Sequence, residues 1–93
     1  MTIQAFADKH GLVMEIHERE RPSDANMRFW ANFKLAEVRE GCCLAGVLGN
    51  GATPKDAVRE YATKISLKTL VIDAFHDRKE IKVPRLTRNP TGG

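Results

Sequence analysis

The sequence lacks the features that mark disulfide-rich, membrane-spanning and secreted proteins. Its 93 residues include only two cysteines, and because Cys42 and Cys43 are adjacent they do not indicate a disulfide framework. The longest apolar run, residues 42–48, falls far short of the roughly 20 residues that a membrane span needs. Residues 1–9 show neither a basic start nor a long apolar stretch, so we expect no secretory signal and a cytoplasmic protein.

The composition is that of a small folded domain. Hydrophobic residues make up 42% of the chain and charged residues 29%, which is close to ordinary soluble usage. We expect a single domain over residues 1–84. Residues 85–93 contain Pro90 and end in two glycines, which predicts a flexible basic tail.

The net charge of +3 is unevenly distributed. Residues 1–47 hold six basic and seven acidic groups, whereas residues 48–93 hold nine basic and five acidic groups. A basic region of this kind is typical of a nucleic-acid binder, but it is also typical of a solvated segment that keeps a small protein soluble.

Two segments have the pattern of a helix. Thr2 is a suitable cap, apolar residues follow at helical spacing, and Gly11 is a natural stop, which predicts a helix near residues 2–10. A second start is formed by Thr53 as cap, Pro54 in the first turn and Asp56 three residues after the cap. It precedes an apolar stripe and predicts a helix over 54–65.

Alternating apolar residues predict strands at 12–17 and 27–38, and a third strand at 42–48 after the turn at residues 39–41. Residues 70–72 and 81–83 predict a C-terminal hairpin. The fold class is therefore α+β: an α-β-β-β-α core, in which two helices cover one face of a three-stranded antiparallel sheet, plus a C-terminal β-hairpin. The expected core residues are Ile3, Phe6, Met14, Ile16, Phe29, Phe33, Leu35, Val58, Tyr61 and Ile65.

The junction between the third strand and the second helix resembles that of the double-stranded-RNA-binding domain. That family has Gly-x-Gly-x-Ser-Lys-Lys-x-Ala here, and residues 49–57 match it at Gly49, Gly51, Thr53, Lys55 and Ala57. Pro54 stands where the family has its first lysine. Antitoxins of the HicB kind are similar at the same junction. The resemblance implies this fold and a nucleic-acid-binding or regulatory function.

Three segments, 6–12, 49–57 and 68–72, look like parts of small proteins encoded by phages and prophages. Some proteins of this size are anti-CRISPR inhibitors, which bind a type I surveillance complex and block target DNA. This second resemblance implies a non-enzymatic inhibitor. Its partner would be a CRISPR surveillance ribonucleoprotein in the host cytosol.

Trp30 is the most informative single residue. The strand pattern places it opposite Phe29 and Phe33, where it could stack on a base or anchor a protein interface. The alternative is that this face is also covered and Trp30 belongs to the core. The expected partner-binding patch comprises Arg19, Arg21, Arg28, Trp30, Asn32 and Lys34. The loop arginines could equally balance the acidic residues between them.

For the nucleic-acid-binding alternative, the basic residues of the second half would meet RNA or DNA phosphates. This set comprises Lys55, Arg59, Lys79, Lys82 and Arg85.

Catalytic motifs are not recognisable. Gly46 and Gly51 have P-loop spacing, but Ala52 and Thr53 occupy the places of its lysine and hydroxyl residue. The histidines and adjacent cysteines do not have zinc-ligand spacing, and Asp73, His76 and Asp77 are better explained as turn residues than as acid–base groups. We therefore expect neither an enzyme nor a cofactor or metal.

Overall fold

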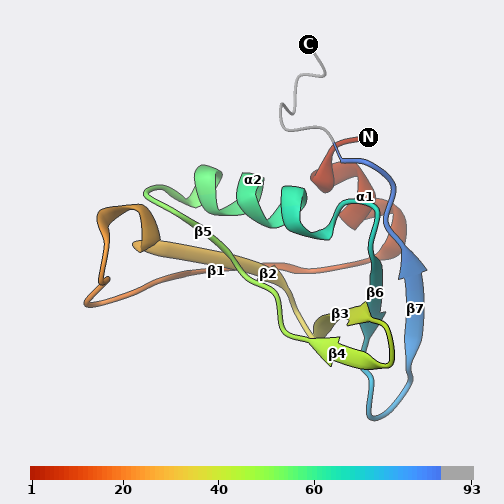
Figure 1. The fold of residues 1–93 in the computed structure, drawn as a ribbon. Coiled ribbons are helices and arrows are strands. Elements are labelled where there is room, and N and C mark those ends of the chain that lie inside the picture. Colours follow the sequence, from red (N-terminus) through yellow and green to blue (C-terminus); the bar gives the residue numbers. More distant parts are fainter. Residues whose placement is uncertain (87–93) are drawn as a thin grey trace.

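The computed structural model describes residues 1–86, which form two α-helices and two antiparallel sheets (Figure 1). This confirms the α+β class. Helix α1 spans Ile3–His10 and α2 spans Pro54–Ile65, close to the predicted ranges. No helix within residues 1–86 has the length and apolar character needed to cross a bilayer.

Both helices begin and end where local chemistry favours it. The Thr2 hydroxyl accepts a hydrogen bond from the Ala5 N–H at 3.1 Å, and Gly11 ends α1 in the left-handed conformation with φ of 65°. The Thr53 hydroxyl accepts from the Asp56 N–H at 3.1 Å. Pro54 then occupies the first helical turn of α2, where its missing N–H has no cost.

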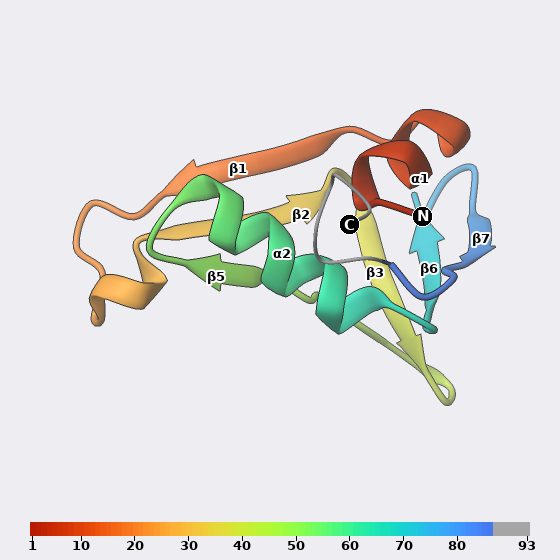
Figure 2. The ribbon, with the colours of Figure 1, turned by 90° about the horizontal axis from the view of Figure 1, so that it is seen from above.

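The first sheet has the strand order β1-β2-β5 and lies under α2 (Figures 1 and 2). Its strands are β1 (Met14–Glu18), β2 (Phe29–Phe33) and β5 (Gly49–Gly51). A short 3-10 helix, Ala25–Met27, lies in the loop between β1 and β2. Residues 49–51, which follow the predicted strand 42–48, form a short strand of their own, because they pair with β2.

The second sheet has the order β4-β3-β6-β7 and stands at the other end of the molecule (Figure 1). Its strands are β3 (Ala36–Glu40), β4 (Cys43–Ala45), β6 (Thr69–Ile72) and β7 (Lys79–Lys82). The predicted C-terminal hairpin is confirmed as β6 and β7. It is not a separate addition, because β6 pairs with β3.

The predicted continuous strand 27–38 is wrong, because the chain turns at Lys34 and Leu35 and passes from one sheet to the other. Leu35 has φ of 61°, in the left-handed region, and its side chain is 61% exposed. Leu35 is therefore not a core residue. The strand predicted at 42–48 is shorter than expected, since only Cys43–Ala45 forms a paired strand there.

The two sheets and both helices share one core. Of the residues expected in it, Phe6, Phe33, Tyr61 and Ile65 are buried, and Ile3 and Met14 are half-buried against the cluster. Phe29 and Val58 are also half-buried. Ile16 is 44% exposed, contrary to expectation, because β1 is an edge strand.

The expected basic tail over 85–93 lies mostly outside the described residues. Its first two members, Arg85 and Leu86, are described. Leu86 packs in the core, and its N–H donates to the Ser66 hydroxyl at 3.0 Å. The packed part of the chain therefore extends beyond residue 84.

Candidate functional site

The face of the first sheet that points away from α2, here called the outer face, gathers aromatic and polar side chains. Side chains alternate along a strand, and the register pairs Glu15 with Asn32, His17 with Trp30, and Trp30 with Asn50. Directly opposed residues point the same way. These five residues therefore share the outer face, while the residues between them face the helix.

The centre of the outer face is a stacked pair of rings. The ring centroids of His17 and Trp30 lie 4.1 Å apart, and the ring planes are inclined by 20°. Trp30 is half-buried and His17 is exposed. Trp30 thus belongs to a surface pair rather than to the core, and its partner His17 was missing from the predicted patch. Extending the strand alternation to the β1–β2 register would have found it.

Two amide oxygens beside Trp30 have no partner. The Oδ1 atoms of Asn32 and Asn50 are buried, and neither accepts a hydrogen bond from the described residues. A buried acceptor left unsatisfied costs about 1–3 kcal/mol. Since both oxygens are already shut off from solvent, they are a local cost to the fold rather than contact points for a partner.

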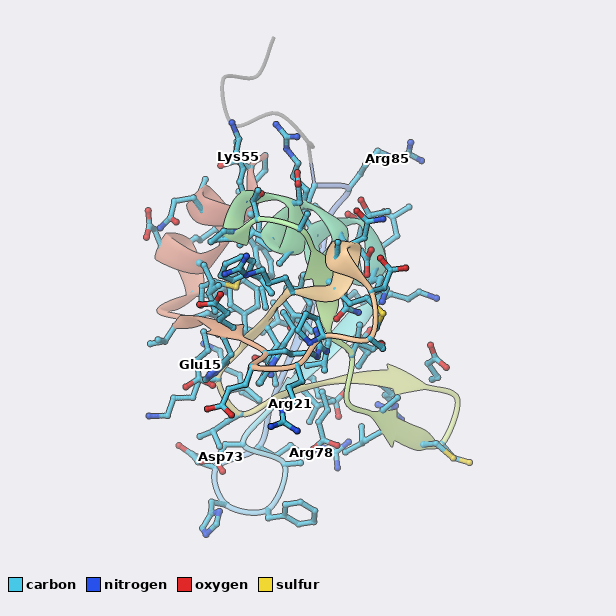
Figure 3. The ribbon with its side chains drawn as sticks, turned by 90° about the vertical axis from the view of Figure 1, so that its left-hand side faces the viewer. Glu15, Arg21, Lys55, Asp73, Arg78 and Arg85 are labelled. Atoms are coloured by element: carbon cyan, nitrogen blue, oxygen red, sulfur yellow. The ribbon has the colours of Figure 1, made fainter. Side chains whose placement is uncertain are left out.

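The arginines predicted for the patch differ in whether a hydrogen bond or ion pair holds their side chains. A guanidinium nitrogen of Arg19 donates to the Met27 carbonyl at 2.6 Å, and Arg28 forms an ion pair with Glu18 at 2.7 Å. Arg21 has no such tie within residues 1–86. Figure 3 shows Arg21 and Glu15 on the side of the first sheet opposite α2. Arg21 is therefore the loop cation best placed to act together with the outer face.

The structure thus brings together part of the predicted patch. Trp30 and Asn32 share the outer face, and Arg21 lies on the same side of the sheet. Arg19 and Arg28 border a hollow of about 530 Å³ in the β1–β2 loop, together with acidic Glu18 and Glu20. Lys34 lies after the opposite end of β2, at the turn into the second sheet.

The predicted nucleic-acid-binding set is divided between two places. Lys55 and Arg59 lie on α2, and Arg59 borders a groove of about 570 Å³ between α2 and β5. Asp56 and Glu60 line the same groove, and Arg59 lies 3.8 Å from Asp56. Two carboxylates against one guanidinium make this groove a poor site for phosphates.

Glu60 instead has a structural part in that groove. Its carboxylate accepts a hydrogen bond from the Asn50 backbone N–H at 3.0 Å and lies 3.0 Å from the Lys64 ammonium. The Asn50 N–H is the main reason that the pKa of Glu60 is lowered, with Lys64 adding to the effect and partial burial opposing it. Glu60 thus ties α2 to β5.

The other half of the set, Lys79, Lys82 and Arg85, lies on or after β7, on the second sheet. Lys79 and Lys82 border a groove that also contains Lys9 and His10 of α1. Lys9 and His10 were not in the predicted set, because no local pattern in the sequence brings residue 9 to the same groove as residue 79.

The groups considered for acid–base chemistry lie in the β6–β7 turn. His76 Nδ1 and Asp73 Oδ1 are 3.2 Å apart, and the His76 side chain is largely exposed. Within residues 1–86, no three His, Cys, Asp or Glu side chains cluster closely enough to hold a metal.

Comparison with models of known protein families, with curated proteins and with solved structures finds no match to this chain.

Proposed function

We propose that the protein is a non-enzymatic, phage-encoded inhibitor of the anti-CRISPR kind, acting in the cytosol of the bacterial host. It would bind a CRISPR surveillance ribonucleoprotein and block its recognition of target DNA. The resemblance of three segments to small phage proteins supports the class of partner. The outer face supports binding rather than catalysis.

The observation that carries the proposal is the stacked His17–Trp30 pair on the face of the first sheet that points away from α2. Tryptophan and arginine dominate the energetics of protein interfaces, and Arg21 lies on the same side of the sheet as Trp30. Charges at the outer face are of both signs, since Glu15 lies on it and Arg21 lies on the same side of the sheet. A mixed charge pattern suits a protein surface better than a uniform row of phosphates.

The test is co-purification of the protein with type I surveillance complexes, combined with phage plating on CRISPR-immune cells. Arg21→Glu/Trp30→Ala should lose both activities. The matched control Phe75→Ala/Lys68→Glu also removes an exposed aromatic ring and reverses one cation, but away from the outer face, and it should retain both. Thermal unfolding of each variant would show that the domain remains folded.

Trp30 is the single tryptophan of the chain, so its fluorescence reports directly on the outer face. Adding the purified complex should change its emission. Wild-type protein that neither binds the complexes nor restores plating would overturn the proposal. Capture of nuclease-sensitive material alone would favour the alternative, a nucleic-acid-binding or regulatory domain.

A further inference from the structure

A second surface lies between α1 and β7, at the end of the molecule that carries the second sheet (Figures 1 and 2). It is a groove of about 560 Å³. Lys9 and His10 line it from α1, and Lys79 and Lys82 line it from β7. Apolar Phe6 and Ile81 also contribute, so cationic side chains stand over a partly apolar lining.

The charge of this groove is uncompensated. Lys9, Lys79 and Lys82 are exposed, and no ion pair or hydrogen bond ties their side chains to another residue within 1–86. Glu80 is the one acidic residue that lines the groove. Its carboxylate is already engaged by Arg39 at 2.8 Å and by Arg78 at 3.1 Å. The Arg39 hydrogen bond is the main reason that the pKa of Glu80 is lowered.

Lysines on an edge strand can also serve to prevent pairing with another sheet. That explanation covers Lys79 and Lys82 but not Lys9, which lies on a helix far away in the sequence. Cations from two separate elements border the same groove, while the one acid that lines it is already paired with two arginines. This convergence indicates a site for a polyanion.

We propose that the groove between α1 and β7 binds single-stranded nucleic acid by its phosphodiester backbone. Lysine is a point charge on a flexible stem, so it contacts phosphates without reading sequence. The cations line the two walls of a groove, which a single strand can enter. The phosphates of a duplex lie on a wide convex cylinder and would meet these walls poorly.

This site is separate from the outer face, so it does not depend on the proposed function. It can be tested by fluorescence anisotropy with labelled single-stranded DNA and RNA of about 20 nucleotides, long enough to fill a site of about 4–16. Both strands should bind, with an affinity that falls steeply as salt is raised. The variant Lys9→Gln/Lys79→Gln/Lys82→Gln removes three phosphate contacts. Each contact contributes about 0.7 to the slope of log affinity against log salt concentration, so the variant should bind about a hundredfold more weakly at 0.1 M salt.

The matched control is Lys55→Gln/Arg59→Gln/Lys64→Gln, which removes the same charge from α2. It should bind the single strands nearly as well as the wild type, with the salt slope unchanged. Equal losses in both variants would mean a general charge effect and would overturn the assignment of the groove. Preference for a duplex of the same length, or no binding at low salt, would also overturn it.

Discussion

The two faces of the first sheet are made by the same three strands, yet they have opposite roles. The inner face carries Ala31, Phe33, Gly49 and Gly51, all buried, and α2 closes it. The outer face carries His17, Trp30 and the two asparagines, and within residues 1–86 it has no covering helix (Figure 1). Because side chains alternate along a strand, the same strands contribute to a tightly packed core surface and to an uncovered surface that can bind a partner.

The fit of the inner face is closest at the two glycines. A Cβ atom at Gly49 would overlap the Ala57 carbonyl oxygen and the Tyr61 nitrogen, and one at Gly51 would overlap the Ala57 nitrogen. These are backbone atoms of α2, which cannot move aside alone. The glycines of the junction segment therefore act by letting α2 approach β5. This packing reason accounts for a Gly-x-Gly junction without any nucleic-acid contact.

The largest effect should come from filling that inner contact. Gly49→Ala/Gly51→Ala should cost about 3 kcal/mol or more per site, which approaches the whole stability of a small domain. Circular dichroism should show mostly unfolded protein at room temperature. Gly46→Ala is the control, because a Cβ atom there meets nothing within 4 Å. A folded double variant with wild-type stability would contradict the close approach of α2.

Next in size is the contrast between two aromatic residues of the same strand. Phe33 is fully buried against Phe6 and Tyr61, so Phe33→Ala should reduce the free energy of unfolding by about 3–5 kcal/mol. Trp30→Ala removes a larger side chain but only a surface stack, so about 1 kcal/mol is expected. Urea unfolding of both variants would measure the difference. Equal losses would mean that the outer face is part of the core.

A smaller effect concerns the tie between α2 and β5. Glu60→Gln should lower the free energy of unfolding by about 1 kcal/mol at pH 7. The substitution removes the negative charge of a partly exposed side chain, and that charge strengthens the hydrogen bond from the Asn50 N–H and the ion pair with Lys64. The pKa of Glu60 is lowered in the folded protein from 4.5, so its contribution is complete above that pH. It is lost as pH falls through the folded pKa. Unfolding curves of the variant and wild type should therefore converge at low pH, and a constant gap would contradict this origin.

The smallest predicted effect is a gain in stability, and it is expected at Leu35, where the alternation of the first sheet ends. Leu35→Gly should stabilise the protein by about 0.5 kcal/mol, since glycine relieves the left-handed conformation and the exposed leucine loses little packing. Thermal unfolding would detect the rise. If Leu35 were an inner-face residue, as the alternation predicts, the same change would instead destabilise the protein by several kcal/mol.

Local signals made parts of this structure predictable. The caps at Thr2 and Thr53 act within a few residues, so both helices were placed almost to the residue. The alternation from Phe29 to Phe33 likewise assigned Trp30 and Asn32 to the face opposite Phe33. In the sequence Leu35 fits the same alternation, but in the structure it does not, because its own positive φ redirects the chain into the second sheet.

The α+β class, the two helices and the shared side of the β2 residues can all be predicted from the sequence, because capping and side-chain periodicity are local properties. Three other features follow from tertiary structure alone: the strands form two sheets, His17 stacks on Trp30, and Lys9 borders the same groove as Lys79 and Lys82. These relations join residues far apart in the chain. They depend on which strands pair and how closely α2 packs on β5, and no local pattern records that choice.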